Sequence, residues 1–285
     1  MVLIQCSVDL GVSRLVMACR NEKKGQEARK AILTKTSQKS MPIVEVWNID
    51  MAVKSSVVAF AKRAVAELEC IDALLLNAGI DTNVFEMADG DESTLTVNVI
   101  STFLLARALL PKLADTAART SSSTRLTILG SSIHAFAADL QLTTPSDGKI
   151  FSTLNDARTA DMASRYFLSK LMVGLCVREL ANEVDRTQTV VNCVNPGWCK
   201  TNLFRVDDGG LGGRIGLRLI GRTSEEGSRT MVHALSAGVE THGEYLSECK
   251  VKPASAFVRS AEGEKTQKRL WAELKTKLDA SLSGI

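Results

Sequence analysis

The feature that most constrains the fold of this chain is a regular alternation between short apolar runs and longer amphipathic segments. Strand-like apolar runs occupy residues 14–19, 43–49, 71–76, 126–129 and 187–194. Segments with helical spacing lie between them, notably 54–68, 92–113 and 161–184. Apolar strands separated by helices are typical of a parallel sheet covered on both faces. The sequence therefore predicts an α/β fold with a doubly wound parallel sheet, in which the run 71–76 is a buried strand.

The organisation of the chain favours one domain. Its 285 residues suit one large domain or two smaller ones, and no internal repeat or long linker divides them. The last part is expected to hold a helix at 224–235, a short strand-like run at 244–246 and an amphipathic helix at 262–282. We therefore expect a single domain over residues 1–285, with residues 224–285 as a small C-terminal helical extension. In the helix 92–113, Asp91 is a plausible N-cap, and Pro111 should lie near the end.

Charge and composition exclude several classes of function. Lysine and arginine total 35 against 32 acidic residues, which gives a net charge of +3 without a basic block, so we expect no nucleic-acid partner. No run of 18 apolar residues occurs, so no membrane span is expected. The seven cysteines are scattered and only three histidines exist, a pattern that lacks the clustered ligands of a metal site. Reduced cysteines in apolar runs and a start without signal-peptide character favour a cytoplasmic protein.

Tyr166 and Lys170 form the pair with the clearest chemical meaning. They lie four residues apart in a helix-forming segment, so both side chains fall on one helix face. A phenol with a pKa near 10 is a poor proton carrier at neutral pH, and a neighbouring ammonium lowers that pKa. The pair therefore suits proton transfer, although this spacing also arises by chance on solvated helices.

Small polar residues follow several of the predicted strands. They are Asn77 to Gly79 after the run 71–76, Ser131 and Ser132 after 126–129, and the segment Asn195 to Thr201 after 187–194. Asn98 lies in the helix that follows the first of these groups. Because ligands approach an α/β sheet at the carboxyl ends of its strands, we expect these groups to share one edge with Tyr166 and Lys170.

In their order along the chain, these motifs resemble the short-chain dehydrogenase/reductase superfamily. The resemblance covers nearly the whole chain from about residue 10 and looks closest to retinol-dehydrogenase-like members of fungal secondary metabolism. It implies a Rossmann-type sheet and names Tyr166 as proton donor or acceptor. It further implies that Lys170 lowers the pKa of Tyr166 and holds the nicotinamide ribose. By the same resemblance, Ser132 would bind the reacting carbonyl or alcohol, and Asn98 would support a proton-relay water.

The resemblance also implies a nicotinamide cofactor, NADP(H). Cys19 stands where relatives that prefer NAD carry an acidic residue, and Arg20 follows it, able to pair with a 2′-phosphate. Asp50 matches the position that contacts adenine. The remaining implied cofactor contacts are Asn77, Ala78 and Gly79 at the adenosine ribose, and Cys199 and Thr201 at the carboxamide and pyrophosphate.

One departure from the family pattern concerns the front of the chain. Members begin with a strand and a T-G-x-x-x-G-x-G loop that cradles the pyrophosphate at a helix N-terminus. Here the run 14–19 matches the second strand, so the usual first strand and glycine-rich loop, about 25 residues, are expected to be missing. The glycine-rich stretch 207–216 follows a different strand and is interpreted as part of a substrate lid over residues 202–223.

This departure leaves three alternatives open. The chain could be an incomplete product of a gene for an ordinary enzyme. It could be a truly truncated enzyme that uses Tyr166, Lys170 and Ser132 without a cofactor, as a lyase, isomerase or cyclase. It could also be an inactive paralogue that acts as a scaffold.

A second departure is the long separation between Ser132 and Tyr166, where compact members have about a dozen residues. Residues 133–158 are interpreted as an insertion at the substrate region, with His134 as a surface loop residue. The apolar Phe136, Leu140 and Phe151 favour a hydrophobic small-molecule substrate. The expected reaction is the interconversion of a hydrophobic ketone or aldehyde and its alcohol. A homodimer through the helices that carry Asn98 and Tyr166 is also possible, given the apolar stripe 102–110, which core packing alone would also explain.

Overall fold

The strands of this protein form three sheets, of which the largest carries the candidate site. The computed structural model describes residues 2–35, 42–197, 199 and 222–283. The largest sheet has the order β3-β6-β7-β8-β9, with the bounds Ala73–Leu76, Thr124–Leu129, Thr189–Asn195, Tyr245–Ser247 and Lys250–Val251. Its first four strands are parallel, and β9 is antiparallel to β8. A parallel pair of β1 (Arg14–Cys19) and β2 (Ile43–Asn48) and an antiparallel pair of β4 (Met87–Ala88) and β5 (Asp91–Glu92) complete the strands.

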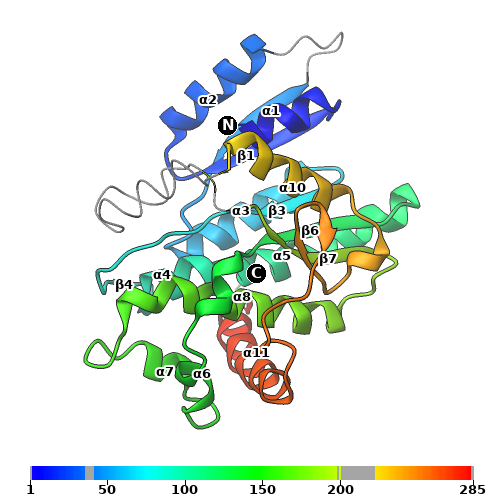
Figure 1. Cartoon of the computed structure of the whole chain (residues 1–285). Coiled ribbons are helices and arrows are strands. Elements are labelled where there is room, and N and C mark those ends of the chain that lie inside the picture. The colour runs from blue at the N-terminus through cyan, green and yellow to red at the C-terminus, as the bar shows by residue number, and fades with distance from the viewer. Residues whose placement is uncertain (1, 36–41, 198, 200–221, 284–285) are drawn as a thin grey trace.

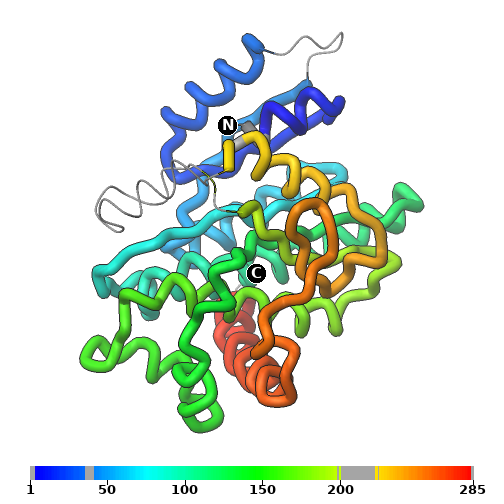
Figure 2. The backbone as a smooth tube through the Cα atoms, in the orientation of Figure 1, coloured from blue at the N-terminus to red at the C-terminus, as the bar shows by residue number. Residues whose placement is uncertain are grey.

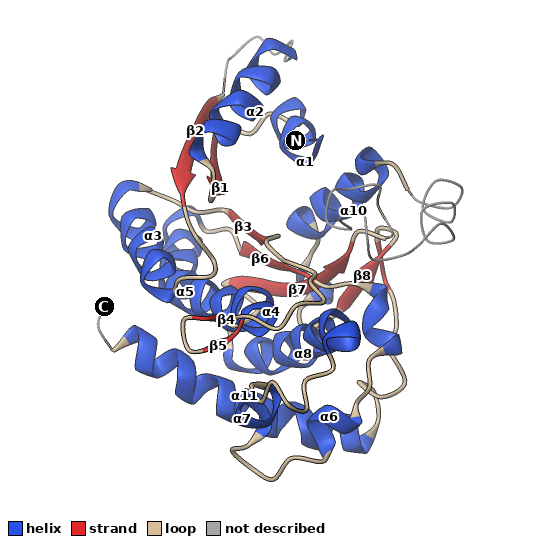
Figure 3. Cartoon of the chain, turned by 90° about the vertical axis from the view of Figure 1, so that its left-hand side faces the viewer, coloured by secondary structure: helices blue, strands red, loops and turns tan. Residues whose placement is uncertain are grey.

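Helices cover both faces of the five-stranded sheet (Figure 3). On one face lie α3, α5 and α8, with the bounds Lys54–Glu67, Ser101–Thr120 and Met162–Glu183, and the long α11 (Ala261–Leu282) packs against their outer side. On the other face, α10 (Ser224–Ser236) contacts β6, β7 and β8. The remaining helices are α1, α2, α4, α6 and α7, at Val2–Asp9, Glu22–Lys35, Ser93–Leu95, Leu140–Thr143 and Ile150–Leu154. The predicted α/β fold with a parallel sheet between helical layers is thus confirmed.

The sheet is not continuous across the molecule. Strands β1 and β2 pair only with each other in the described residues, and β3 pairs only with β6. Figures 1 and 2 show residues 2–35 and 42–48 gathered at one end of the molecule, where α1 packs against α10. The expected single sheet is therefore two separate parallel sheets, because no described strand bridges β1 and β3.

The break in the sheet changes the burial of its neighbouring strands. The run 71–76 was expected to be a buried strand, but in β3 only Leu76 is buried, whereas Leu74 and Leu75 are half-exposed. In β1, likewise, only Met17 is buried. An apolar strand becomes fully buried only where neighbours and helices cover it, and among the described residues each of these strands has one unpaired edge.

The longest helical stretch, Ser93–Thr120, differs from its prediction at both ends. Its N-cap is Glu92, whose carboxylate accepts hydrogen bonds from Thr94 N and Leu95 N, and not Asp91. Pro111 lies inside α5, and the helix continues to Thr120. This stretch has the length and hydropathy of a membrane span, and 78% of its most apolar window is buried within the fold. Packing inside the protein therefore accounts for its apolar composition, the stripe 102–110 included.

Candidate active site

Tyr166 and Lys170 lie on α8, as the sequence predicts. Asp161 caps this helix by accepting a hydrogen bond from Ser164 N. Both site side chains are buried, with exposed fractions of 7% and 3%, and the Lys170 Nζ lies 5.7 Å from the centre of the Tyr166 ring. One turn of a buried helix therefore holds a phenol and an ammonium group side by side.

Lys170 is fixed in place by the end of a neighbouring strand. Its Nζ donates a hydrogen bond of 2.9 Å to the main-chain oxygen of Leu129, the last residue of β6. Burial lowers the pKa of Lys170 to about 8, because the charged form loses hydration. The ammonium group thus lies at the carboxyl edge of the sheet, where parallel α/β proteins bind ligands.

The pKa of Tyr166 shifts in the direction opposite to the prediction from its lysine neighbour. Burial raises the pKa of the phenol, and the charge of Asp81 adds to this effect. Desolvation of the phenolate is thus the main cause of the raised pKa in these surroundings. The hydroxyl of Tyr166 is consequently protonated at neutral pH, which suits a proton donor.

Asn98 joins the segment after β3 to α8. It lies in a π-helical turn, Thr96–Ile100, a distortion that occurs often at functional sites. Its Oδ1 accepts a hydrogen bond from Ile80 N at 2.8 Å, and its Nδ2 donates to Ile80 O and to Ser169 Oγ. Ser169 in turn donates to the main-chain oxygen of Tyr166. Asn98 therefore connects two of the elements that carry predicted site residues.

Ser132 begins a 3-10 helix, Ser132–Phe136, at the end of β6, and its side chain is exposed. Its backbone N–H donates to Asn195 Oδ1 at 3.1 Å, and Gly197 N donates to the same oxygen. Asn195, the last residue of β7, thus holds together the loops that follow β6 and β7. The sequence named Asn195 only as the start of the polar segment 195–201 and gave it no role of its own, although a polar residue between an apolar strand and a Pro-Gly turn is a recognisable signal.

The residues expected at the adenosine half of a cofactor divide between two parts of the fold. Arg20 and Asp50 follow β1 and β2 of the small sheet, and Asp50 Oδ1 accepts a hydrogen bond from Ala52 N. Asn77 and Ala78 are exposed just after β3 of the large sheet, with Gly79 half-buried beside them. Of the remaining predicted contacts, Cys199 donates to Pro196 O at 3.3 Å, and Thr201 lies outside the described residues, as does most of the predicted lid 202–223.

His134 is a buried residue and not the surface loop histidine that the sequence suggested. Ser255 N donates to its Nε2 at 3.0 Å, so the proton lies on Nδ1, which donates to Ser131 O at 2.6 Å. Its ring also packs edge-on against Tyr245. His134 therefore connects the 3-10 helix of the site to the loop before α11, a long-range contact that local sequence does not reveal.

The chain resembles short chain dehydrogenases in sequence. A profile of the short chain dehydrogenase family matches residues 8–125. The chain is 41% identical to a short chain dehydrogenase/reductase, dmxR8, of Cryptosporiopsis sp. (strain 8999), over 98% of this chain and 86% of that protein. It is 37% identical to a short-chain dehydrogenase, anuD, of Penicillium roqueforti (strain FM164), over 97% and 73% of the two chains.

Solved structures share the fold at low sequence identity. The 3-ketoacyl-(acyl-carrier-protein) reductase of Brucella melitensis, solved with NADH, superposes with a TM-score of 0.62 at 17% identity, over 86% of this chain and 89% of that one. The NADPH-bound carbonyl reductase from chicken fatty liver gives a TM-score of 0.58 at 19% identity, over 84% and 87%. The architecture around the candidate site is therefore one that known reductases use.

Proposed function

Because this chain belongs to the short-chain dehydrogenase/reductase family, we propose that it is an NADP(H)-dependent oxidoreductase that interconverts a hydrophobic ketone or aldehyde and its alcohol. The proposal includes membership of the retinol-dehydrogenase-like branch of the family and a place in fungal secondary metabolism. The observation that carries it is the gathering of Tyr166, Lys170 and Asn98 on adjoining elements at the carboxyl edge of the sheet.

The residues near Lys170 fit the nicotinamide ribose of such a cofactor. An ideal Cβ added to Gly79 would lie 3.4 Å from Asn98 Oδ1 and 3.7 Å from Lys170 Nζ. The missing side chain thus leaves an approach to a buried ammonium group, whose N–H groups suit ribose hydroxyls. Arg20, placed after β1, would select the 2′-phosphate of NADP(H) through its planar guanidinium.

Fewer structural observations support a binding site for the phosphate end of the cofactor. Within the described residues, no glycine-rich turn leads into a helix ahead of β1, where backbone N–H groups would cradle a pyrophosphate. Strands β1 and β2 are also separate from the large sheet. Both observations leave the residues that would contact the pyrophosphate unassigned within the described part of the chain.

When bound, NADP(H) supplies or accepts a hydride at its nicotinamide ring, and the chain handles the proton. In the direction of reduction, the Tyr166 hydroxyl donates its proton to the carbonyl oxygen as that oxygen gains negative charge. The raised pKa of Tyr166 keeps this proton in place until then. The exposed Ser132 hydroxyl donates a hydrogen bond to the same oxygen and orients it, while Lys170 holds the ribose and stabilises negative charge on the phenol oxygen.

A hydrophobic substrate is supported by exposed apolar side chains near Ser132. Phe136 and Leu140 are 77% and 70% exposed, unusually high values for large apolar residues, and both follow Ser132 closely in the chain. Phe151, which the sequence grouped with them, is 1% exposed and belongs to the core. The substrate surface is thus proposed on Phe136 and Leu140 alone.

The alternative reaction is cofactor-independent acid–base chemistry by Tyr166, Lys170 and Ser132. The specific observation that favours it is the broken sheet without a described phosphate cradle. In this case the enzyme would be a lyase, isomerase or cyclase, and turnover would not depend on NADPH.

Two measurements test the proposal. Calorimetric titration with NADPH should show micromolar binding and weaker binding of NADH, whereas turnover without NADPH binding would favour the alternative.

In assays of NADPH-dependent reduction over a panel of hydrophobic ketones, Tyr166→Phe should lower kcat at least 100-fold, because proton transfer contributes about 10²–10⁴-fold. The variant should bind NADPH normally, and retained turnover in it would contradict the mechanism.

A homodimer and a cytoplasmic setting are also proposed. The helices α5 and α8 remain the predicted dimer surface, but the stripe 102–110 is largely buried within the chain and lends that surface no support. Sedimentation of the purified protein measures the oligomeric state directly.

A further inference from the structure

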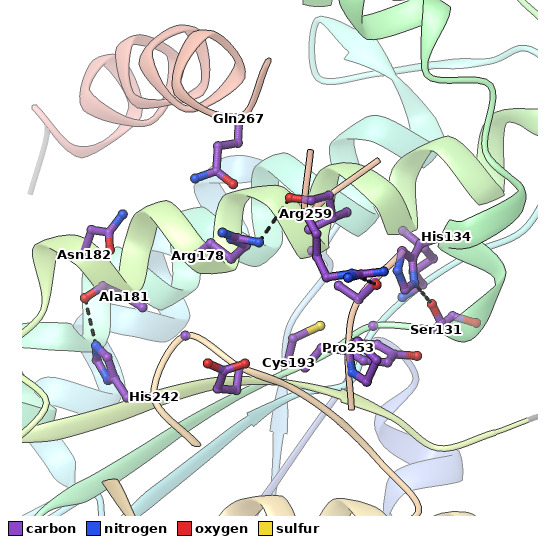
Figure 4. A pocket seen from close by; sticks show the side chains of 18 residues that line it. Ser131, His134, Arg178, Ala181, Asn182, Cys193, His242, Pro253, Arg259 and Gln267 are labelled. Atoms are coloured by element: carbon purple, nitrogen blue, oxygen red, sulfur yellow. Dashed lines mark hydrogen bonds between the residues drawn. The ribbon is translucent and has the colours of Figure 1, made fainter. Parts of the chain in front are cut away.

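A cavity of about 310 Å³ lies beside the catalytic centre. It is bounded by α8, the ends of β6 and β7, the start of β8, the loop 253–259 and α11 (Figure 4). Lys170 and Ser131 line it, whereas Tyr166 and Ser132 do not. The cavity therefore shares a wall with the catalytic centre but is a separate space.

The charged side chains that line this cavity are mainly cationic. Arg178 of α8 donates one hydrogen bond to Val258 O, and Arg259 donates one to Ala254 O. Each guanidinium carries five N–H groups in a planar fork, so most of them stay available to an anion. With Lys170 the lining holds three cations against one carboxylate, that of Glu244.

Gln267 adds an unsatisfied acceptor to the cavity. Its side chain is 3% exposed, and its Nε2 donates to Glu179 Oε1 at 2.5 Å. Its Oε1 has no hydrogen-bond partner in the described part of the chain. Figure 4 shows this side chain reaching from α11 toward Arg178. A buried amide oxygen without a partner is costly, and a ligand hydroxyl or N–H would satisfy it.

Gly174 keeps the cavity open. It lies in the middle of α8, where glycine is unfavourable, and an ideal Cβ added to it would meet no atom within 4 Å. No close packing in the described residues requires a glycine at this position. What the glycine does provide is free volume between Lys170 and Arg178, one turn from each.

The cavity walls are held by two neutral histidines. Val191 N donates to Nδ1 of His242, so its Nε2 carries the proton and donates to Ala181 O. His134 is fixed between Ser131 and Ser255, and burial lowers its pKa. The space is therefore preformed, as ligand pockets usually are, and its positive charge comes from the arginines and Lys170.

We propose that this cavity is a second ligand site, which binds a small aromatic hydroxy acid. The carboxylate of the ligand pairs with Arg178 and Arg259, its hydroxyl donates to Gln267 Oε1, and its ring packs against Ala254 and Val258. The site does not depend on the proposed oxidoreductase activity, since neither the cofactor nor Tyr166 takes part in it.

Calorimetric titration with 3- and 4-hydroxybenzoate, compared with benzoate, tests the chemistry of this site. In these isomers the hydroxyl cannot bond its own carboxylate. The better isomer should bind the wild-type protein at least fivefold more tightly than benzoate. Gln267→Leu should remove this preference, and Arg178→Met should weaken all three ligands at least tenfold. Equal binding of benzoate and both isomers by the wild-type protein would overturn the role of Gln267.

A pair of glycine variants tests the location of the site. Gly174→Leu should fill the free volume and weaken binding of the better isomer at least tenfold. Gly174→Ala adds only a methyl group and should retain binding within about threefold. Thermal melts at or above the wild-type midpoint would show that both variants fold. Wild-type affinity in Gly174→Leu, or loss of binding in Tyr166→Phe, would place the ligand elsewhere and overturn the proposal.

Discussion

Lys170 carries its charge in surroundings that disfavour it. Its side chain is buried, its pKa is lowered to about 8, and its single described hydrogen bond goes to Leu129 O. Relative to an ordinary lysine with a pKa of 10.5, this shift corresponds to about 3 kcal/mol of destabilisation at pH 7. The proposed catalytic position is thus maintained at a cost in the free energy of folding, a frequent property of functional sites.

Lys170→Met should therefore stabilise the protein while abolishing the proposed activity. At pH 7 we expect a gain of roughly 2 kcal/mol in the free energy of unfolding, because the relieved desolvation exceeds the lost bond to Leu129 O. The sign follows from proton binding: above pH 8 the folded state releases the Lys170 proton before the unfolded state does, so wild-type stability rises toward pH 10.5. Urea titrations should show a smaller difference in the free energy of unfolding between the variant and the wild type at pH 10 than at pH 7. A variant less stable than wild type at pH 7 would contradict this account.

Single residues also show how far sequence can predict a site. Tyr166 and Lys170 could be paired because helical spacing alone fixes their common face. The burial of His134 depends on its contact with Ser255, 121 residues away, which the local pattern around His134 does not encode. The pKa direction of Tyr166 was similarly out of reach, because desolvation depends on the whole surrounding fold.

At the level of elements, Asp91 joins the hairpin β4–β5 to three other segments. Its carboxylate is 1% exposed and accepts hydrogen bonds from Lys277 Nζ of α11 at 2.8 Å and from Asn155 Nδ2 at 2.7 Å. Lys54 Nζ of α3 lies 3.5 Å away. Burial raises the pKa of Asp91, but the hydrogen bonds and charges of Lys277, Asn155 and Lys54 outweigh it and hold the pKa below its usual value.

Asp91→Asn should destabilise the protein by roughly 2–3 kcal/mol at pH 7, since it leaves two lysines without their buried partner. A carboxylate with a lowered pKa contributes stability above its unfolded value of about 3.8, and this contribution is lost as the pH falls through the folded value. The difference in Tm between wild type and variant should accordingly shrink below pH 4.

Asp115→Asn is the matched control for Asp91→Asn. Asp115 is 53% exposed and pairs with Lys112 and Arg119 only at 3.9 Å, so its loss should change stability by less than about 0.5 kcal/mol. Equal effects of the two substitutions would show that the buried cluster around Asp91 contributes no more than a surface pair.

The prediction of elements succeeded where periodicity was strong and failed at boundaries. The helices α3 and α8 lie within about one residue of their predicted limits. In the stretch Ser93–Thr120, by contrast, tertiary packing carries the helix past Pro111, and the cap is Glu92 because Asp91 is engaged with α11. Long-range contacts therefore set the ends of this helical stretch, which the local sequence did not define.

On the scale of the whole molecule, the sequence predicted the class of the fold but not the separation of its sheets. Apolar runs showed which segments form parallel strands, since their burial needs helices on both faces. Whether consecutive strands join one sheet depends on which neighbours are available to pair, and β1 and β3 share none in the described residues. The half-exposed Leu74 and Leu75 follow from the same cause.

This separation predicts unequal stability within one chain. Strands β6 and β7 have partners on both sides, whereas in the part of the chain that the structure describes β1 pairs only with β2 and packs with α2. Native-state hydrogen exchange should therefore show the amides of β1 and β2 opening with a free energy several kcal/mol below that of β6 and β7. Equal protection of all four strands would mean that the two sheets unfold as one unit.

The division between the two sheets also has a thermodynamic consequence for the proposed cofactor. Arg20 and Asp50 follow strands of the small sheet, whereas Gly79 follows β3 of the large sheet and Lys170 lies on α8, which covers that sheet. A dinucleotide bound to these four residues would act as a non-covalent crosslink. Part of its binding free energy would then hold one sheet in a fixed position relative to the other. Ligand at 100 times its Kd adds about 2.7 kcal/mol to the stability of the state that binds it. Cofactor concentration would thus set how often the first strands detach from the rest of the molecule.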